Sequence, residues 1–361
     1  MQIGIVGLPF AGKSTLFQTI TKTHLDPAAL TKAEAHQAVV KVPDARLDRC
    51  SSIFSPKRTI HATIEFVDVV GLKKGESGST QFTNNFLANV KTNDALVQVV
   101  RQFANDAVPH PDGSIDALRD VTTFETEFIL SDLAVIETRI ERIKKQTQKA
   151  GDEQGKRELP VLEKCHAALE AETPLREVDF TKEEMLLLKT YQLLSLKPML
   201  IALNMDESQK ESADGLVKRV AARKEGKRTR TMSFFGKIEM EMSELAEDEA
   251  RLFMEEYGIK QSALDTLIRE AYSLLGLQSF FTVGEDECRA WTIRKETSAQ
   301  EAAGVIHSDF FNKFIRAEVV QYDDFISHDG SFAKTKEAGV WRLEGKEYVV
   351  KDGDIVTIRH S

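Results

Sequence analysis

Apolar and polar residues follow two recurring patterns in the first part of the chain, one typical of buried strands and one typical of amphipathic helices. Apolar runs bounded by turn residues predict strands at residues 2–6, 64–70, 95–100 and 199–204. Helical stretches lie between them. Because strands that alternate with helices form mostly parallel sheets covered by helices, the pattern predicts an α/β fold.

A different pattern lies between the third and fourth of these strands. Apolar residues there recur at alternating intervals of four and three, as in a helix that packs along one partner. These residues are Ile129, Leu133, Ile136, Ile140 and Ile143. A polar, glycine-containing stretch at residues 149–155 predicts a turn, and a second helix continues through Leu162 and Leu169 until Pro174 ends it. We therefore predict an antiparallel helical hairpin, either an arm for partner contact or a structural decoration.

Short strands separated by turn signals replace these helices after about residue 278. Strands are predicted at residues 280–283, 290–293, 315–319, 347–350 and 355–358, with one helix at 299–305. This pattern predicts a small α+β domain. The whole chain then divides into a split domain at residues 1–124 and 196–277, a helical coiled-coil insertion at 125–195 and a C-terminal domain at 278–361.

Composition changes this picture little. The 361 residues have a net charge of −9, which argues against a wholly basic nucleic-acid coat. No apolar run approaches the roughly 20 residues that span a bilayer, and the chain opens on a strand rather than a signal peptide. Cys50, Cys165 and Cys288 lie far apart without a metal-binding spacing. We therefore expect a cytoplasmic protein with reduced thiols and no membrane contact.

One short stretch opposes the acidic average. Residues 218–230 contain seven lysines and arginines, and Glu225 is the only acidic residue among them. Two interpretations stay open for this basic stretch: a solvated helix face and loop, or a contact with the phosphate backbone of a nucleic acid.

The first chemical motif begins at the end of the first strand. Residues 7–15 read GLPFAGKST, which contains the phosphate-binding pattern G-x-x-x-x-G-K-S between a strand and an amphipathic helix. In such a loop successive backbone N–H groups surround a polyphosphate, and the helix directs its positive end toward it. Lys13 is expected to reach the β- and γ-phosphates and the Ser14 hydroxyl to bind Mg²⁺. The pattern predicts a nucleotide-binding site.

A second motif follows the predicted strand at residues 64–70. Asp68 and Gly71 form D-x-x-G, in which the carboxylate holds Mg²⁺ through water and the glycine N–H senses the γ-phosphate. Leu72 comes next, at the position where many GTPases have a glutamine that orients water. Because a leucine cannot polarise water, we expect slow unaided hydrolysis and assign no catalytic residue.

The base-recognition motif is expected after the last of the four strands. Asn204 is followed there by Met205, Asp206 and Glu207, whereas guanine-specific proteins have N-K-x-D. The aspartate of that motif accepts two hydrogen bonds from guanine, and Glu207 is a methylene too long for the same geometry. Adenine lacks this pair of donors, so the motif predicts relaxed or adenine-favouring specificity.

Together these motifs resemble the YchF family of Obg-like ATPases, and the resemblance extends almost from end to end. It includes the segments GIVGLPxxGKSTLF, EFVDxxGLxKG, FLANVKTNDAL and KIExE. In the C-terminal part, RAWTIR at 289–294, AGVIHSDF at 303–310, FIRAEV at 314–319 and YVVKDGD at 348–354 also match family signatures. Segments of this length and specificity do not coincide by chance.

The resemblance implies a P-loop G-domain, a coiled-coil insertion and a C-terminal ubiquitin-like TGS domain. It also implies ATP (or GTP) and Mg²⁺ as ligands, slow hydrolysis, and association with ribosomes and rRNA; we expect a monomer. The implied nucleotide contacts are Phe10, Ala11, Gly12, Lys13, Ser14, Thr15, Gly71, Asn204, Met205 and Glu207. The implied metal ligands are Ser14, Asp68 and Thr31.

Four departures from the family pattern cluster on the nucleotide pocket. They are Phe10-Ala11 in place of Asn-Val, Lys32 in place of the first-switch threonine, glycines reduced to positions 71, 75 and 78 in the second switch, and Phe235-Gly236 in place of Ser-Ala. The Phe10 ring must point away from the phosphates if the loop is to close around them. Thr31, beside Lys32, supplies a second Mg²⁺ hydroxyl only if its loop shifts by one residue.

Three functions stay open on the sequence. The first is an ATPase that acts as a nucleotide-dependent conformational switch on ribosomes. The second is a nucleotide-gated RNA- or ribosome-binding module without turnover, which Leu72 favours. The third is a GTP-specific GTPase, which residues 204–207 disfavour.

Overall fold

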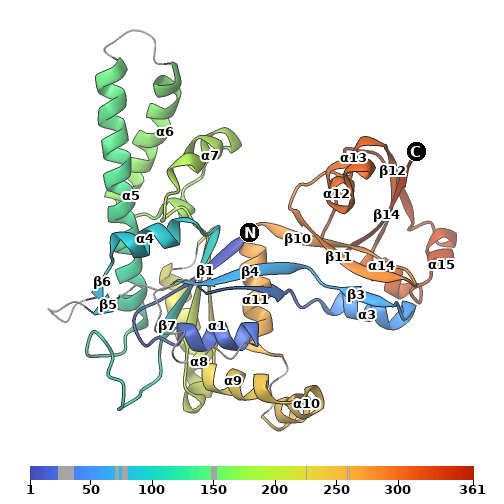
Figure 1. Ribbon diagram of the computed structural model, residues 1–361, viewed down its shortest axis with the longest axis horizontal. Coiled ribbons are helices and arrows are strands. Elements are labelled where there is room, and N and C mark those ends of the chain that lie inside the picture. The colour runs from blue at the N-terminus through green and yellow to red at the C-terminus, as the bar shows by residue number, and fades with distance from the viewer. Residues whose placement is uncertain are drawn as a thin grey trace. The chain divides into compact units, whose positions relative to one another are not determined.

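The computed structural model describes residues 1–22, 36–69, 73–74, 80–147, 153–224, 226–257, 259 and 261–361. The chain divides into two compact units (Figure 1). The first unit comprises Met1–Ala38 and Glu65–Leu274, and the second comprises Val39–Ile64 and Leu275–Ser361. Among the described helices, none combines the length and the apolar character that crossing a bilayer requires.

A six-stranded sheet forms the centre of the first unit. Its order is β2-β4-β1-β7-β8-β9, and each pair from β4 to β9 is parallel. The strands are β1 (Gln2–Val6), β2 (His36–Lys41), β4 (Thr63–Asp68), β7 (Ala95–Arg101), β8 (Met199–Asn204) and β9 (Thr229–Phe234). The four predicted strands and the parallel α/β class are thereby confirmed. Every residue of β7 and β8 is buried, which explains their continuous apolar runs.

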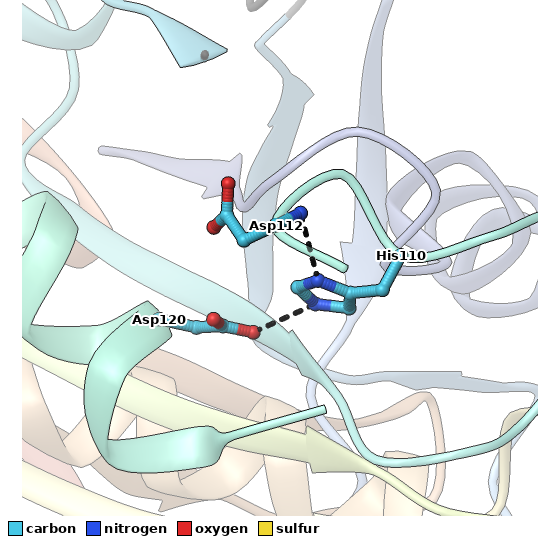
Figure 2. Close-up of side chains that lie close together, drawn as sticks. All are labelled: His110, Asp112 and Asp120. Atoms are coloured by element: carbon cyan, nitrogen blue, oxygen red, sulfur yellow. Dashed lines mark hydrogen bonds and ion pairs between the residues drawn. The ribbon is translucent and has the colours of Figure 1, made fainter. Parts of the chain in front are cut away.

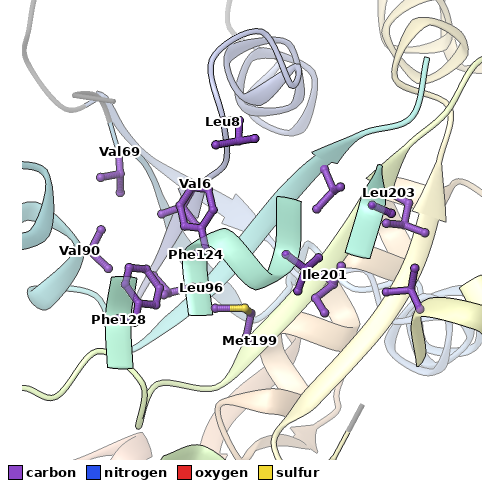
Figure 3. Close-up of a cluster of buried hydrophobic side chains, with 14 of the residues drawn as sticks. Val6, Leu8, Val69, Val90, Leu96, Phe124, Phe128, Met199, Ile201 and Leu203 are labelled. Atoms are coloured by element: carbon purple, nitrogen blue, oxygen red, sulfur yellow. The ribbon is translucent and has the colours of Figure 1, made fainter. Parts of the chain in front are cut away.

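Helices of the first unit bury apolar side chains against this sheet. Val90 of α4 and Phe124 of α5 join strand residues such as Leu96 and Leu203 in one cluster (Figure 3). Val220 of α8 belongs to the same cluster. The shorter helices of this unit include α1 (Lys13–Thr21), α4 (Asn84–Lys91), α8 (Lys210–Lys224), α9 (Gly236–Glu244), α10 (Glu247–Glu256), which packs on α9, and α11 (Ala263–Leu274). The core fixes the carboxyl ends of β1, β4, β7 and β8, from which the candidate site residues emerge.

Two long helices, α5 (Ala117–Thr147) and α6 (Glu153–Glu170), lie side by side and form the predicted hairpin (Figure 1). Ile136 and Ile143 of the predicted stripe are fully buried against α6 residues such as Leu162. The start of α5 packs in the sheet core through Phe124, so one continuous helix joins the sheet to the hairpin. The turn predicted at residues 149–155 is too long, because α6 begins at Glu153, where a carboxylate stabilises a helix N-terminus.

A second six-stranded sheet, of order β13-β12-β14-β10-β11-β3, forms the second unit. It mixes antiparallel pairs with two parallel ones, β10 with β14 and β11 with β3. The strands are β3 (Arg58–Ile60), β10 (Leu277–Thr282), β11 (Glu287–Arg294), β12 (Phe314–Gln321), β13 (Arg342–Glu344) and β14 (Asp354–His360). Its helices are α3 (Ala45–Phe54), α12 (Ala299–Ile306), α13 (Ser308–Asn312), α14 (Tyr322–Ser327) and α15 (Phe332–Glu337). The predicted α+β character is confirmed.

One predicted strand of this unit is wrong. Residues 347–350 form only an isolated bridge between Val349 and Ser298. The backbone turns here, with the Tyr348 N–H donating to the Gly345 oxygen at 3.2 Å. The Tyr348 hydroxyl donates to Asp354 at 2.9 Å, and this contact holds the segment as a loop.

The segment between β2 and β4 was not predicted and belongs to the second unit. Its strand β3 pairs with β11, and Phe54 of its helix α3 stacks on Phe325. Arg46 of α3 donates to Asp44 and, at 2.8 Å, to Asp352. Short elements complete the fold: β5 (Lys73–Lys74), β6 (Thr80–Gln81), α7 (Lys182–Leu188) and 3₁₀ turns at Leu175–Glu177, Lys189–Tyr191 and Glu207–Gln209.

Candidate functional site

The predicted phosphate-binding loop lies between β1 and α1. Gly12 precedes α1 with a φ of +97°, a left-handed conformation that favours glycine. A Cβ on Gly12 would lie 2.3 Å from Asn204 Nδ2, and one on Gly7 would lie 2.4 Å from the Val99 carbonyl oxygen. A side chain at either Gly7 or Gly12 would therefore clash, because the loop packs against the ends of β7 and β8.

Phe10 occupies the middle of this loop with a φ of +64°. Its side chain is 59% exposed, so the ring points toward solvent and leaves the loop interior free, as the sequence required. The next residue, Ala11, is buried, and its carbonyl accepts a hydrogen bond from Asn204 Nδ2 at 3.1 Å. A left-handed backbone is unusual for a bulky residue, so the Phe10 substitution strains the loop locally.

Lys13, Ser14 and Asp68 meet at the start of α1. Lys13 Nζ donates to the Leu8 carbonyl at 3.0 Å, and the Ser14 hydroxyl donates to Asp68 Oδ2 at 3.1 Å. Burial lowers the pKa of Lys13 to about 8, and the Asp68 charge opposes this shift. Burial raises the pKa of Asp68, while Lys13, Ser14 and His36 oppose that rise. Lys13 and Asp68 thus lie near each other in a buried site. Burial disfavours the charged form of each, so a bound ligand of opposite charge would stabilise it.

The same residues fit a divalent metal. Ser14 Oγ and Asp68 Oδ2 are both oxygen donors, the ligand type that Mg²⁺ prefers, and the hydrogen bond between them shows that they can converge on one point. Asp68 is 2% exposed, so its charge is shielded little by solvent. Thr31, expected as a further metal ligand, lies outside the described residues, as do Lys32, Gly71 and Leu72.

The Asn204 side chain joins the phosphate loop to the turn after β9. Its Nδ2 donates to Ala11, and its Oδ1 accepts from the Gly236 N–H at 3.1 Å. A Cβ on Gly236 would lie 2.8 Å from this Oδ1. The change from Ser-Ala to Phe235-Gly236 therefore gives the Asn204 amide room to make its contact.

Met205 and Glu207 present different groups at the expected base site. The Met205 side chain is buried in the sheet core and its N–H donates to the Phe234 carbonyl at 2.9 Å, so a base would meet the Met205 carbonyl. Glu207 is exposed at the rim of a pocket of about 40 Å³. Lys210, Phe235, Ile238, Tyr257 and Ile259 line the rest of it. This volume is far below the roughly 300 Å³ of a typical ligand pocket, so base binding would require the pocket to widen.

A buried histidine and two aspartates lie together in and after the loop that follows β7 (Figure 2). His110 Nε2 is 3.0 Å from Asp120 Oδ2, and His110 Nδ1 accepts the Asp112 N–H at 3.2 Å. The other Asp120 oxygen accepts from Arg119 at 2.8 Å. Because Nδ1 accepts the hydrogen bond from the Asp112 N–H, the ring proton is on Nε2, which donates a hydrogen bond to Asp120. Both nitrogens are engaged, and we interpret the group as a buried polar network, not a metal site.

The structure divides the basic stretch at residues 218–230 into two groups. Lys224 pairs with Glu125 of α5, and Lys227 pairs with Asp179. Arg230 donates to the backbone oxygens of Gly226 and Thr229. Lys224 therefore ties α8 to α5, Lys227 ties the turn before β9 to Asp179, and Arg230 holds that turn together.

The second group consists of Lys218, Arg219 and Arg223, which we call the α8 basic face. The seventh cation, Arg228, is half-buried and belongs to neither group. All three side chains are exposed, and none forms an ion pair within the part of the chain that the structure describes. Charges left unpaired on one helix are available to a polyanion.

Two family models match the chain. The model described as a 50S ribosome-binding GTPase matches residues 2–164, and the YchF-GTPase C-terminal model, described as a protein of unknown function, matches residues 277–361. The first match contains the phosphate loop and Asp68. The second contains most of the second unit.

Curated and solved proteins match over nearly the whole chain. The ribosome-binding ATPase YchF of Bacillus subtilis is 42% identical over 99% of this chain and 98% of its own length. The protein of the same name from Haemophilus influenzae is 43% identical over 99% of this chain and 98% of its own length. The solved YchF GTPase of Schizosaccharomyces pombe has a TM-score of 0.85 at 32% identity, covering 99% of this chain and 97% of that one.

Proposed function

Because this chain belongs to the YchF family, we propose that it is a Mg²⁺-dependent ATPase whose nucleotide state controls its binding to ribosomes, in the cytoplasm. The observation that supports this most is the meeting of Lys13, Ser14 and Asp68 at the phosphate loop. We assign the second unit as the ubiquitin-like TGS domain and the α5–α6 hairpin as the coiled-coil insertion, with the protein acting as a monomer.

Each residue of the site has a proposed task. The backbone of residues 10–15 and the Lys13 ammonium would hold the polyphosphate. Ser14 and Asp68, with Thr31, would hold Mg²⁺, which neutralises charge on the β- and γ-phosphates when bound. Asn204 would keep the loop beside the base, and the Met205 carbonyl and Glu207 would contact it. The Gly71 N–H would sense the γ-phosphate.

Slow turnover follows from the residue beside this glycine. Leu72 offers no hydrogen bond to water, whereas a glutamine at that place orients the attacking water in many GTPases. The protein would then rest mostly in its ATP form until a partner supplies the missing interaction. That behaviour suits a switch better than a metabolic enzyme.

Calorimetric titration with ATP and with GTP tests the nucleotide assignment. The relatives are named both ATPase and GTPase, so the comparison is informative. We expect ATP to bind at least as tightly as GTP, because Glu207 replaces the aspartate that guanine requires. Tight GTP binding without measurable ATP binding would overturn the assignment in favour of a GTP-specific GTPase.

A second candidate function is a nucleotide-gated ribosome-binding module without turnover, and Leu72 is the observation that favours it. Phosphate release from ATP, measured with and without ribosomes, separates the two candidates. We expect release above that of a Lys13→Ala variant, and more so with ribosomes. Release equal to that of the variant under both conditions would leave only the binding module.

A further inference from the structure

Arg101, the last residue of β7, is a buried cation without a counter-charge among the described residues. Its side chain is 3% exposed, and its guanidinium donates from Nε to the Phe103 carbonyl at 3.1 Å and from Nη2 to the Val108 carbonyl at 2.8 Å. Nη1 is buried and has no hydrogen-bond partner there. Across the described ranges no carboxylate pairs with it, whereas the equally buried Arg176 pairs with Glu125.

An uncompensated charge of this kind is unfavourable inside a protein. Removing a guanidinium from water is costly unless opposite charge or full hydrogen bonding replaces the lost hydration. Two backbone carbonyls accept hydrogen bonds from the Arg101 guanidinium, and the centre of the Phe103 ring lies 4.7 Å from its Cζ. None of these groups is an anion, so the positive charge itself stays unneutralised. A buried cation with a free donor therefore indicates a missing anion.

The register of the sheet shows where that anion would be. Arg101 lies directly beside Asn204 in the parallel pair β7–β8, and such neighbours, about 4.8 Å apart, direct their side chains to the same face. On that face the Asn204 amide contacts Ala11 and crowds Gly12 of the phosphate loop. Two residues before Arg101, the Val99 carbonyl is the atom that excludes a side chain at Gly7. Arg101 thus leaves the sheet next to the phosphate loop.

We propose that Arg101 is a second phosphate-binding cation of the nucleotide site, with the free Nη1 as its donor. The anion it lacks is then the polyphosphate, and its charge adds to that of Lys13. The inference rests on the proposed binding of a nucleotide. Because Nε and Nη2 hold Phe103 and Val108, a phosphate on Nη1 would also tie the loop after β7 to the ligand.

A purely structural role is the alternative, in which Arg101 only clamps this loop through its two carbonyl contacts. The number of phosphates on the ligand distinguishes the two roles. A phosphate contact affects the binding of ATP and leaves that of adenosine unchanged, whereas a distorted loop affects both alike.

Calorimetric titration of the full-length Arg101→Met variant with ATP, ADP and adenosine is the test. We expect ATP affinity to fall by about 10- to 100-fold, the range of one or two charge-assisted hydrogen bonds, while adenosine binds as to the wild type. An Arg101→Lys variant, which keeps the charge and loses the fork, should show a smaller loss with the same dependence on phosphates. This variant also serves if Arg101→Met fails to fold.

Arg119→Met is the matched control. Arg119 holds the same loop by donating to Ser114 and is paired with Asp120, so it has no charge to offer a ligand. Its loss should leave the ratio of ATP to adenosine affinity unchanged. Equal losses for ATP and adenosine in the Arg101 variants, or ATP affinity within about threefold of the wild type, would overturn the inference.

The controls separate this inference from the function on which it rests. If the wild type binds no ATP, the nucleotide function fails and the inference fails with it. If the wild type binds ATP, Lys13→Ala weakens it and Arg101→Met does not, the inference alone is wrong.

Discussion

Phe10 adopts a backbone conformation that bulky side chains rarely occupy. We expect Phe10→Asn to raise the free energy of unfolding by about 1 kcal/mol, because asparagine tolerates a φ of +64° better and the exposed ring loses little burial. In thermal unfolding this corresponds to roughly 1–2 °C in a chain of this size. Phe10→Ala removes the ring and keeps an unfavourable backbone, so it should gain nothing. An equal gain in the alanine variant would assign the effect to the ring.

Lys13 should make nucleotide binding depend on pH. Its pKa is lowered to about 8 by burial, and a bound polyphosphate would raise it by stabilising the ammonium. Above about pH 8 the free protein has lost this proton and must regain it on binding, so affinity for ATP should fall as the pH rises from about 8 toward about 10. Below about pH 7 the Lys13 proton is already present, so Lys13 should no longer contribute to the pH dependence.

Calorimetry in buffers of different ionisation enthalpy measures this proton uptake directly. We expect uptake that approaches one proton per nucleotide near the upper end of that range. A Lys13→Met variant binds more weakly and should show no uptake from this group. Uptake of equal size in the variant would place the titrating group elsewhere.

The sequence predicted some of these residue contacts and could not predict others. Ser14 and Asp68 were expected to share a metal because their motifs follow strands whose carboxyl ends meet at one edge of a parallel sheet, and the structure brings them to 3.1 Å. The Arg101 guanidinium gave no such signal. The role proposed for Arg101 depends on the register of β7 against β8 and on which described side chains surround it. Neither can be read from the residues next to it in the sequence.

At the scale of a single element, the α8 basic face is the surface that we expect to contact ribosomal RNA. Reversing the charges of Lys218, Arg219 and Arg223 to glutamate should weaken co-sedimentation with ribosomes and reduce its salt dependence. The slope of log affinity against log salt concentration should become shallower by about 0.7–0.9 for every phosphate that the variant no longer neutralises. ATP binding should stay unchanged, because α8 runs from the base side of the site toward the hairpin and these side chains face solvent.

A variant with Lys22, Lys237 and Arg251 reversed is the control for net charge. These side chains are also exposed, and they lie on other helices or their ends. If both variants lose ribosome binding equally, net charge explains the effect. If neither does, the α8 basic face has no part in ribosome binding.

Elements with a strong periodic pattern were predicted well, and elements defined by distant partners were not. The stripe from Ile129 to Ile143 identified its helix because the packing partner follows within the same hairpin. The strand β3 is three residues long and mostly exposed, so no apolar alternation marks it. Its existence depends on β11, far along the chain. The prediction for residues 347–350 was wrong for the opposite reason. Their short apolar run is typical of a strand, but it lies in a loop that the hydrogen bond from Tyr348 to Asp354 holds.

At the scale of the whole molecule, residues 275–361 of the second unit cannot be removed without exposing apolar side chains of α3. Leu47 and Cys50 of α3 are fully buried, and α3 packs against β11. A chain ending at Leu274 would retain α3 and β3 without their partners, so we expect it to bind the dye ANS strongly and to aggregate. The same truncation with residues 42–62, which lie between β2 and β4, replaced by a short glycine-serine linker should bind less dye. Equal dye binding by both chains would show that α3 is not the source of the exposed surface.

The pairing of β3 with β11 also sets the order of events during synthesis. Residues 58–60 leave the ribosome long before residues 287–294, with most of the first unit made in between. At about 5–20 residues per second this delay is on the order of ten to fifty seconds. During that time α3 keeps an apolar face without its partner strand, while the phosphate loop and Asp68 are already made. The nascent chain therefore needs protection at α3 until its last quarter emerges, and slow translation of the middle of the chain would lengthen the interval in which it can misfold.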